Sequence, residues 1–298
     1  MTVLITGGSG FIGKNIIAHF IEHHWDMTNI SRTPVKIQGL KDQMSADISA
    51  ENFIETIQRK VSPCEYIIHC AANIDFNFDN SQVSAVNCLG VHQILQLAKL
   101  WNVKSVVYIS SIGVIGTPVL HPITEMHPLN PKTVYHASKL YGEYLALIAN
   151  AAGLPCSILR LSSPIGPGMP QNKIVSRFVS RACENKPLTI FGTGSRKQNY
   201  VDVRDISFAI EQCITKSVCG IYNIGGDECI SNLDLAKECI ATLNSTSKIA
   251  YSPLDDDEEG VVWDLSIEKA RSDFSYSPKY NIRRSIFDIS NDYENCNH

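Results

Sequence analysis

The sequence predicts an α/β fold: a doubly wound, mostly parallel sheet accompanied by a smaller C-terminal lobe. Three observations predict it. Short apolar runs of strand length alternate with segments of helical periodicity over the first half of the chain. A glycine-rich turn joins the first apolar run to the first helical segment. After residue 165 the pattern becomes shorter, less regular and rich in proline and glycine.

The first half of the chain supplies the sheet and the helices that cover it. Buried strands are expected at residues 3–6, 27–30, 66–69, 105–110 and 156–161, and helices at residues 11–24, 51–61, 81–101 and 134–152. Strands that alternate with helices need right-handed crossovers, which place helices on both faces of a parallel sheet. We therefore expect one sheet domain over residues 1–165.

The second half is expected to form the smaller lobe, over residues 166–298, with some segments returning to the large domain. The apolar patterns predict helices near residues 175–185, 206–215, 233–243 and 282–293, and strands at 188–191 and 221–224. Five consecutive acids at residues 255–259 are expected to form a solvated loop.

Composition excludes several classes of partner. The 298 residues are 44% hydrophobic and 19% charged, with a net charge of -4, so neither nucleic acid nor an anionic membrane is expected to bind. Apolar runs are too short to span a bilayer, and the first residues show no secretory signal pattern. We expect a cytoplasmic protein.

Cysteine and histidine spacing predicts no metal site. The ten cysteines contain no C-x-x-C pair, which favours free thiols in a reducing compartment. The nine histidines show no H-E-x-x-H spacing, and His23 and His24, at the end of a helical pattern, are expected to be solvated.

The glycine-rich turn predicts a dinucleotide site of the Rossmann type. Gly8, Gly10 and Gly13 fit G-x-G-x-x-G in a strand–turn–helix context. Such glycines allow a tight turn and close backbone approach to a pyrophosphate, which rests on the helix N-terminus. The residues expected to contact the cofactor here are Gly7, Gly10, Phe11, Ile12 and Gly13.

The ends of the following strands indicate which dinucleotide binds. An acid at the end of the second strand would suit NAD, but Ser31 and Arg32 stand there. An arginine complements the 2′-phosphate of NADP, with Ser31 donating a hydrogen bond, so NADP is favoured and NAD is the alternative. Further along the chain, Asp47 and Ile48 are placed to meet the adenine, and Ala71 and Ala72 let the cofactor pass close.

Tyr135 and Lys139 form a candidate acid/base pair. In a helix their side chains share one face, because they are four residues apart. A tyrosine is a poor base at neutral pH, but a lysine ammonium and an oxidised nicotinamide would together lower its pKa. Tyr135 could then take a proton from an alcohol or give one to a ketone.

Together these motifs resemble the extended short-chain dehydrogenase/reductase superfamily, and within it the NAD-dependent epimerase/dehydratase family. The glycine turn, Ser110-Ser111 at a strand end and Tyr135-x-x-x-Lys139 carry the resemblance, which runs nearly the full length. It implies that Ser111 binds the reacting oxygen, Tyr135 is the acid/base and Lys139 holds the nicotinamide ribose. It also implies that Asn87 supports the cofactor site, and that helices 81–101 and 134–152 form a homodimer.

Three departures from the family pattern concern the substrate. Sugar-nucleotide 4,6-dehydratases carry an acidic pair where this chain has Ile112-Gly113, so dehydration is not expected. Gln198 stands where sugar-nucleotide relatives often have a phosphate-binding arginine, with Arg196 as a possible substitute. Ser162-Ser163 replaces a common asparagine. The substrate contacts expected are Ser111, Asn172, Arg177, Arg196 and Gln198.

Four functions remain open at this stage. The leading one is a reductase or dehydrogenase that acts on a keto or hydroxy carbon of a small molecule, in particular a sugar nucleotide, in the manner of a 4-ketoreductase. The second is an epimerase that retains NAD and acts on a sugar nucleotide. The third is a reductase of a non-nucleotide ketone, and the fourth is a non-catalytic dinucleotide sensor. The complete set of Ser111, Tyr135 and Lys139 argues against the fourth.

Overall fold

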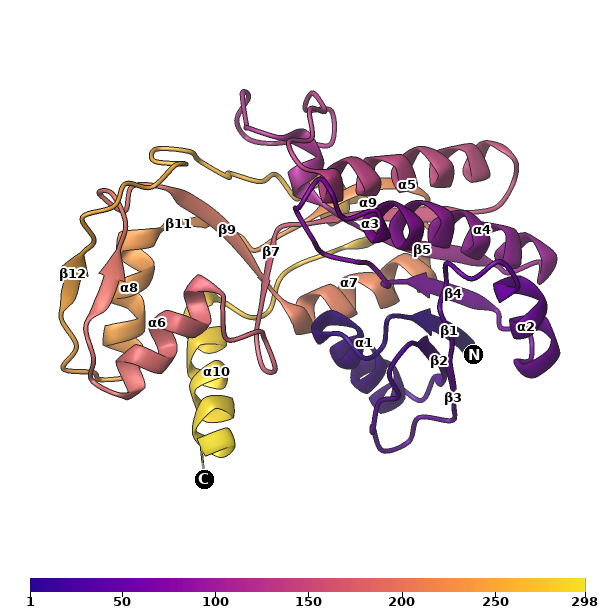
Figure 1. Ribbon diagram of the computed structural model, residues 1–298, viewed down its shortest axis with the longest axis horizontal. Coiled ribbons are helices and arrows are strands. Elements are labelled where there is room, and N and C mark those ends of the chain that lie inside the picture. Colours follow the sequence, from indigo (N-terminus) through magenta and orange to yellow (C-terminus); the bar gives the residue numbers. More distant parts are fainter. Residues whose placement is uncertain (298) are drawn as a thin grey trace.

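The computed structural model describes residues 1–297, with side chains as far as residue 293. Its core is a seven-stranded, wholly parallel sheet in the order β10-β6-β5-β4-β1-β2-β3, which confirms the predicted doubly wound fold (Figure 1). The strands are β1 (Thr2–Thr6), β2 (Asp26–Ser31), β3 (Asp42–Ser45), β4 (Tyr66–His69), β5 (Ser105–Ser111), β6 (Cys156–Leu161) and β10 (Gly220–Ile224). The strand order changes direction between β1 and β4, where such sheets bind their ligands.

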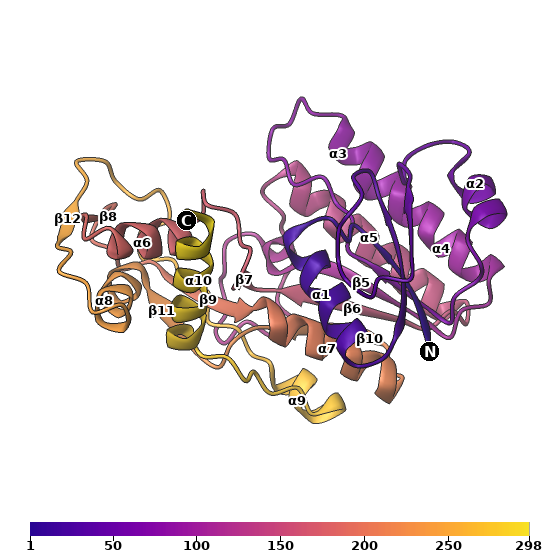
Figure 2. The same ribbon diagram turned by 90° about the horizontal axis from the view of Figure 1, so that it is seen from below.

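Helices cover both faces of this sheet, because alternate strand residues face opposite sides. Val3 and Ile5 pack with α1 (Phe11–Glu22), α7 (Val203–Lys216) and α9 (Glu268–Phe274). Leu4 packs on the other side, with α2 (Phe53–Lys60), α4 (Gly90–Leu100) and α5 (Val134–Ala151). Figure 2 shows the two layers with the sheet between them.

The remaining elements form a smaller lobe beside the sheet (Figures 1 and 2). A three-stranded sheet joins β7 (Ser163–Ile165), β9 (Lys197–Asp202) and β11 (Cys229–Ser231), and a two-stranded sheet pairs β8 (Leu188–Ile190) with β12 (Ile249–Tyr251). The helices α6 (Ile174–Cys183), α8 (Asn232–Thr242) and α10 (Ile282–Asn297) share one apolar core with them. The division at residue 165 stays a prediction.

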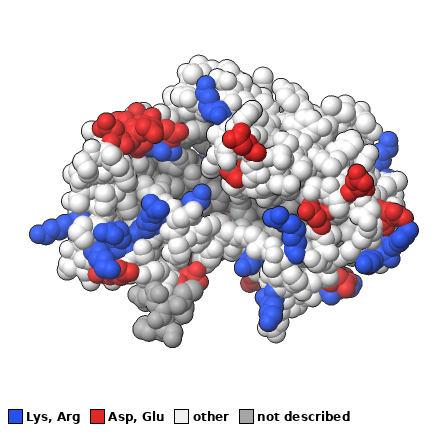
Figure 3. All heavy atoms as spheres, in the orientation of Figure 1, with Lys and Arg blue, Asp and Glu red and all other residues white. Residues whose placement is uncertain are grey.

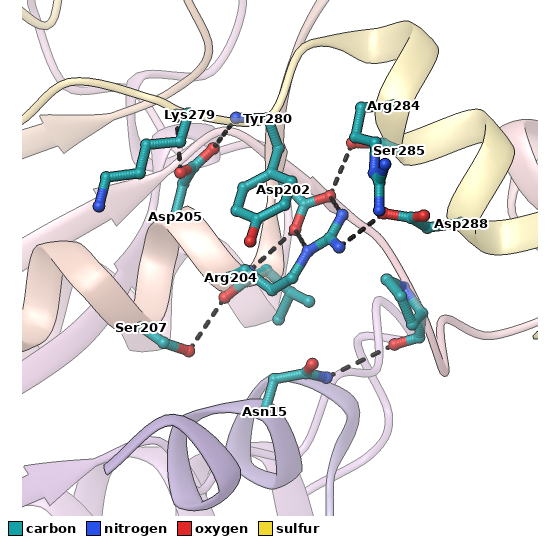
Figure 4. Close-up of polar contacts among 12 residues, drawn as sticks. Asn15, Asp202, Arg204, Asp205, Ser207, Lys279, Tyr280, Arg284, Ser285 and Asp288 are labelled. Atoms are coloured by element: carbon teal, nitrogen blue, oxygen red, sulfur yellow. Dashed lines mark hydrogen bonds and ion pairs between the residues drawn. The ribbon is translucent and has the colours of Figure 1, made fainter. Parts of the chain in front are cut away.

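A charged network fastens this lobe to the sheet domain (Figure 4). Asp202, at the end of β9, accepts hydrogen bonds from Arg204 on α7 (2.8 Å) and from Ser285 on α10 (2.6 Å). Arg204 also pairs with Asp288 at 2.6 Å, and its guanidinium lies 3.6 Å from the Tyr280 ring centroid. Because these residues come from both parts of the molecule, the network holds the smaller lobe against the sheet domain.

The structure also differs from the predicted elements. The expected helix at 81–101 is α3 (Gln82–Ser84), a π-helical turn at Ala85–Leu89 and then α4. Five strands and one helix were not predicted: β3, β7, β9, β11, β12 and α9. Each of them is short or has little apolar alternation, so hydrophobic periodicity gives no signal for it. Within residues 1–297, the helices are all too short or too polar to cross a bilayer.

Candidate active site

A cavity of about 450 Å³ opens at the carboxyl ends of β1, β2 and β4. Most of the cofactor residues expected from the sequence line it: Gly7, Gly10, Phe11, Ile12, Gly13, Ser31, Arg32, Asp47, Ile48, Ala71 and Ala72. Cys70, which follows β4, also lines the cavity, as do Pro164, Pro170 and Lys173 on the side of the smaller lobe. The cavity therefore runs from the end of β2, past the N-terminus of α1, to the lobe.

The glycine turn has no room for side chains. A Cβ on Gly13 would lie 2.2 Å from the carbonyl oxygen of Gly7, and one on Gly7 would lie 2.6 Å from the backbone of Ala71. Gly7 also has a φ of +77°, a conformation that favours glycine. The turn thus packs against β4 and leaves the amides at the start of α1 facing the cavity, which is an arrangement that fits a pyrophosphate.

At the far end of the cavity, Arg32 offers an exposed positive charge. Within residues 1–297 its guanidinium makes no hydrogen bond or ion pair, although it lies close enough to Asp47 to help lower the pKa of that carboxyl, which hydrogen bonds from Ser49 lower most. The Ser31 hydroxyl instead donates to the Thr33 carbonyl at 2.7 Å. The Ser31 proton that we expected to bind a phosphate is therefore donated to the protein backbone instead.

The three candidate catalytic side chains come from two neighbouring elements. Ser111 ends β5, and its hydroxyl accepts a hydrogen bond from the Gly113 amide at 3.2 Å, which leaves its proton free for a substrate. Tyr135 and Lys139 lie on α5, with the Lys139 Nζ 5.9 Å from the centre of the Tyr135 ring. Lys139 Nζ donates to the Ile109 carbonyl at 2.8 Å, so β5 fixes the ammonium beside the tyrosine.

Burial controls the ionisation of this pair. It lowers the pKa of Lys139 to about 8, against the opposing charges of Cys70 and Glu143. Burial also raises the pKa of Tyr135 well above its usual range, and Cys70 adds to the shift. Lys139 alone therefore does not make Tyr135 a base. The lowering that the sequence predicts needs a second positive charge, which an oxidised nicotinamide ring would supply when bound.

Asn87 supports the site through other protein groups. Its side chain accepts from the Asn73 amide at 2.7 Å and donates to the Asn73 carbonyl at 3.0 Å and to the Ser138 hydroxyl at 2.8 Å. The π-helical turn carries Asn87, so the irregular turn joins the loop after β4 to the helix of Tyr135. Asn87, Tyr135 and Lys139 are not among the residues that line the 450 Å³ cavity.

A second cavity, of about 240 Å³, lies in the smaller lobe and shares Pro164 and Lys173 with the first. Arg196 and Gln198 line it, as expected of substrate contacts. Asn172 and Arg177 are not among its lining residues, and their role stays a prediction. Figure 3 shows the hollow between the lobe and the sheet domain.

The acidic run at 255–259 forms an exposed loop, as expected, and two of its acids also contact Arg196. Arg196 forms ion pairs with Glu258 and, at 3.9 Å, with Asp256. Glu259 accepts hydrogen bonds from the Thr193 amide at 3.0 Å and from the Ser195 hydroxyl. Figure 3 shows these acidic side chains gathered over the loop after β12.

Lys173, which the sequence offers as a plausible contact of the substrate lobe, lines both cavities. One further group was missed by the sequence analysis. Phe76, in the loop after β4, lies edge-on to Tyr135 with 5.8 Å between ring centres, and half of its surface is exposed. An aromatic residue in a polar loop indicated this contact only weakly.

Comparisons with known proteins agree with this geometry. Residues 3–225 match the NAD dependent epimerase/dehydratase family. The chain is 30% identical to a putative UDP-glucose 4-epimerase of Methanocaldococcus jannaschii over 99% of each chain. It is also 30% identical to a dTDP-D-glucose 4,6-dehydratase of Dictyostelium discoideum, where the match covers 80% of this chain and only 61% of that protein.

Solved structures share the whole fold. The UDP-glucose 4-epimerase of Thermotoga maritima, solved with UDP-glucose, superposes with a TM-score of 0.90 at 22% identity over 100% of both chains. The UDP-glucuronic acid 4-epimerase of Bacillus cereus, solved with UDP-glucuronic acid and NAD, gives a TM-score of 0.85 at 22% identity, over 99% of this chain and 100% of that one.

Proposed function

The chain belongs to the NAD dependent epimerase/dehydratase family, and from this premise we propose that it is a reductase that transfers a hydride to a keto carbon of a sugar nucleotide, with NADPH as the hydride donor. The observation that carries the proposal is that Tyr135 and Lys139 both lie close to Cys70, which lines the cavity of the glycine turn. Ser111 ends β5, the strand that holds the Lys139 ammonium. In this reading the second cavity takes the nucleotide part of the substrate, near Lys173 and Arg196. The relatives named above act on UDP- and dTDP-sugars, which supports that substrate class.

The side chains would act at the carbonyl oxygen of the substrate. When bound, the reduced nicotinamide supplies the hydride to the carbonyl carbon. The Tyr135 hydroxyl gives its proton to the oxygen, which becomes an alcohol, and Ser111 donates a hydrogen bond to the same oxygen. Lys139 stabilises the phenolate that Tyr135 leaves, until a proton from solvent restores the hydroxyl.

The same side chains would also serve the retaining epimerase, so the cofactor must decide between the two. A reductase exchanges its cofactor at each turnover, whereas an epimerase can keep NAD bound. Arg32, which follows β2 and has no hydrogen bond or ion pair among the described residues, supports NADP and hence the reductase. Dehydration is not proposed, because Ile112 and Gly113 are buried where an acidic pair would be needed.

The first experiment is native mass spectrometry of the purified chain, followed by titration with NADPH and NADH. An empty site that prefers NADPH supports the reductase, and retained NAD(H) with weak NADPH binding supports the epimerase. Arg32→Ala should weaken NADPH binding more than NADH binding, while Lys36→Ala, at another exposed cation in the loop that follows, should change neither. Equal losses in Arg32→Ala would remove the phosphate assignment.

Turnover tests the acid/base role. We expect Tyr135→Phe to leave cofactor affinity nearly unchanged and to lower turnover of a keto-sugar nucleotide by roughly a hundredfold or more. Tyr141→Phe, on the exposed side of the same helix, is the matched control and should keep full activity. An unchanged rate in Tyr135→Phe would exclude this residue from the mechanism.

We further propose that the protein is a cytoplasmic homodimer. Large apolar side chains are exposed on the π-helical turn, α4 and α5, at Leu89, Leu100, Tyr141, Tyr144, Leu147 and Ile148. Burying such a surface against a second copy would stabilise a dimer. The nine cysteines that the structure describes are free, which supports a reducing compartment. Light scattering of Ile148→Glu, against the wild type, would test the dimer.

A further inference from the structure

Two histidines and a glutamate meet on the sheet face that α1 and α7 cover. His19 and His23 lie four residues apart at the C-terminal end of α1, and Glu211 lies on α7, which packs beside it (Figure 2). The Glu211 carboxylate is 2.9 Å from His19 Nε2 and 2.8 Å from His23 Nδ1. His23, expected to be solvated, is therefore held by a carboxylate that lies 188 residues further along the chain.

The three groups have the composition and spacing of a metal site. Their ligand atoms all lie within 4.8 Å of one another. Ligands at 2.0–2.1 Å from a tetrahedral Zn²⁺ ion are about 3.3 Å apart, so small side-chain rotations would admit an ion among these atoms. Two imidazoles and a carboxylate suit Zn²⁺, and His19 is mostly buried while His23 is 41% exposed, which leaves one side open to water.

The surroundings support the ligands. Trp25 donates its indole N–H to Glu211 Oε1 at 3.1 Å, which fixes the carboxylate and leaves Oε2 toward the histidines. Such a second contact is what orients a ligand in known metal sites. The C-terminal end of α1 also carries partial negative charge, which favours a cation.

We propose that His19, His23 and Glu211 bind one Zn²⁺ ion, with water as the fourth ligand. The site is separate from the reaction centre: at about 1.5 Å per helical residue, His23 lies about 18 Å along α1 from Phe11, which lines the cofactor cavity. The ion joins two helices that are far apart in sequence, so its role is to stabilise the fold. The proposal does not depend on the substrate or on the cofactor.

The test is zinc binding by the full chain after treatment with a chelator. We expect one Zn²⁺ per chain by elemental analysis after dialysis, a 1:1 calorimetric titration and a higher Tm with Zn²⁺ present. His23→Gln should weaken binding at least a hundredfold and abolish the Tm shift. Trp25→Phe, which removes the supporting N–H together with part of a buried ring, should weaken it roughly 10–100-fold. His92→Gln, at an exposed histidine on α4, should bind like the wild type.

Two results would overturn the proposal. One is no stoichiometric binding by the wild type, which would leave a hydrogen-bonded cluster only. The other is equal binding by the wild type and His23→Gln, or a cobalt complex with a thiolate charge-transfer band, which would assign the ion to the cysteines. Because His23 is partly exposed, its variant should fold, and unchanged NADPH affinity would verify this independently of the metal.

Discussion

Lys139 and Glu143 are both buried charges on α5, one helical turn apart, and their environments are opposite. Glu143 receives a hydrogen bond from Ser110 at 2.6 Å and two more from Arg160, at 3.0 Å from Nε and 2.7 Å from Nη2. Lys139 has one hydrogen bond, to the Ile109 carbonyl, and its pKa is lowered to about 8. The Glu143 carboxylate is therefore paired with a cation and further hydrogen-bond donors, whereas the Lys139 ammonium has no carboxylate partner among the described residues.

The two residues of α5 therefore have different roles: Glu143 stabilises the fold, and Lys139 is available for chemistry. The Glu143–Arg160 pair is 1% exposed on both sides and joins α5 to β6, with Arg160 also donating to the Glu125 carbonyl. Such a pair holds elements in place and stays fixed once formed. The ammonium of Lys139 keeps donors free for other oxygens, and that unsatisfied state is what a reacting group needs.

The largest effect on stability is expected from breaking the buried Glu143–Arg160 ion pair. Arg160→Met leaves the Glu143 carboxylate buried without its cation, so the free energy of unfolding should fall by about 3–5 kcal/mol. Urea unfolding at neutral pH measures it. The double variant Arg160→Met/Glu143→Leu should recover most of the loss, since it removes both charges. If the double variant is no more stable than the single one, the cost lies in packing and not in charge.

A smaller effect of opposite sign is expected at Lys139. Burial disfavours its ammonium, so Lys139→Met should raise the free energy of unfolding at neutral pH by as much as about 3 kcal/mol while turnover is lost. Lys99→Met, at an exposed lysine of α4, serves as the control and should change little. Should Lys139→Met destabilise the fold, the ammonium is better satisfied than its contacts indicate.

The pH dependence of the free energy of unfolding should show whether ionisation of Lys139 causes the stability gain of Lys139→Met. The folded protein releases the Lys139 proton near pH 8, whereas the unfolded chain holds it to about 10.5. Between these values the unfolded state binds more protons, so the wild type gains stability as pH rises, and its deficit against Lys139→Met should shrink. Urea unfolding of both proteins across this range measures the difference. A constant difference would exclude Lys139 ionisation as its cause.

The smallest effects are expected at two buried serines. Ser110→Ala removes one neutral donor from Glu143 while Arg160 remains, so the loss should be about 1–2 kcal/mol, measured by urea unfolding. Ser162→Ala is a useful contrast, because the Ser162 hydroxyl is buried without a partner among the described residues and its removal should cost less. A larger loss at Ser162 would contradict this ranking.

Local patterns made the sheet and the glycine turn predictable. Gly7, Gly10 and Gly13 stand within one turn, and their role follows from backbone geometry alone. The Tyr135 and Lys139 pair follows from helical periodicity in the same way. By contrast, the π-helical turn at Asn87 has the apolar pattern of an ordinary helix, so its position depends on packing against α5 that one sequence does not reveal.

Contacts between distant segments were not predictable. Glu211 meets His23 only because α7 packs beside α1, and Glu258 meets Arg196 only because the loop after β12 folds back over β9. The β9 strand itself, Lys197–Asp202, contains mostly polar residues and pairs with two other short strands of the lobe. Gln198 and Tyr200 line the 240 Å³ cavity, while Asn199 is buried and donates to the Gly226 and Glu228 carbonyls, so the burial of this strand does not follow apolar periodicity.

The Glu258 carboxylate competes with any anionic ligand for the Arg196 guanidinium, because the two side chains form an ion pair within the smaller lobe. Any anionic group that reaches this guanidinium must displace a carboxylate tethered to the same lobe, whose effective concentration is on the order of millimolar for a short flexible connection. Binding there is then an exchange of one anion for another, with little net change in charge. A dianionic diphosphate would gain more from that exchange than a singly charged ligand. The Arg196–Glu258 ion pair would therefore favour ligands of higher negative charge.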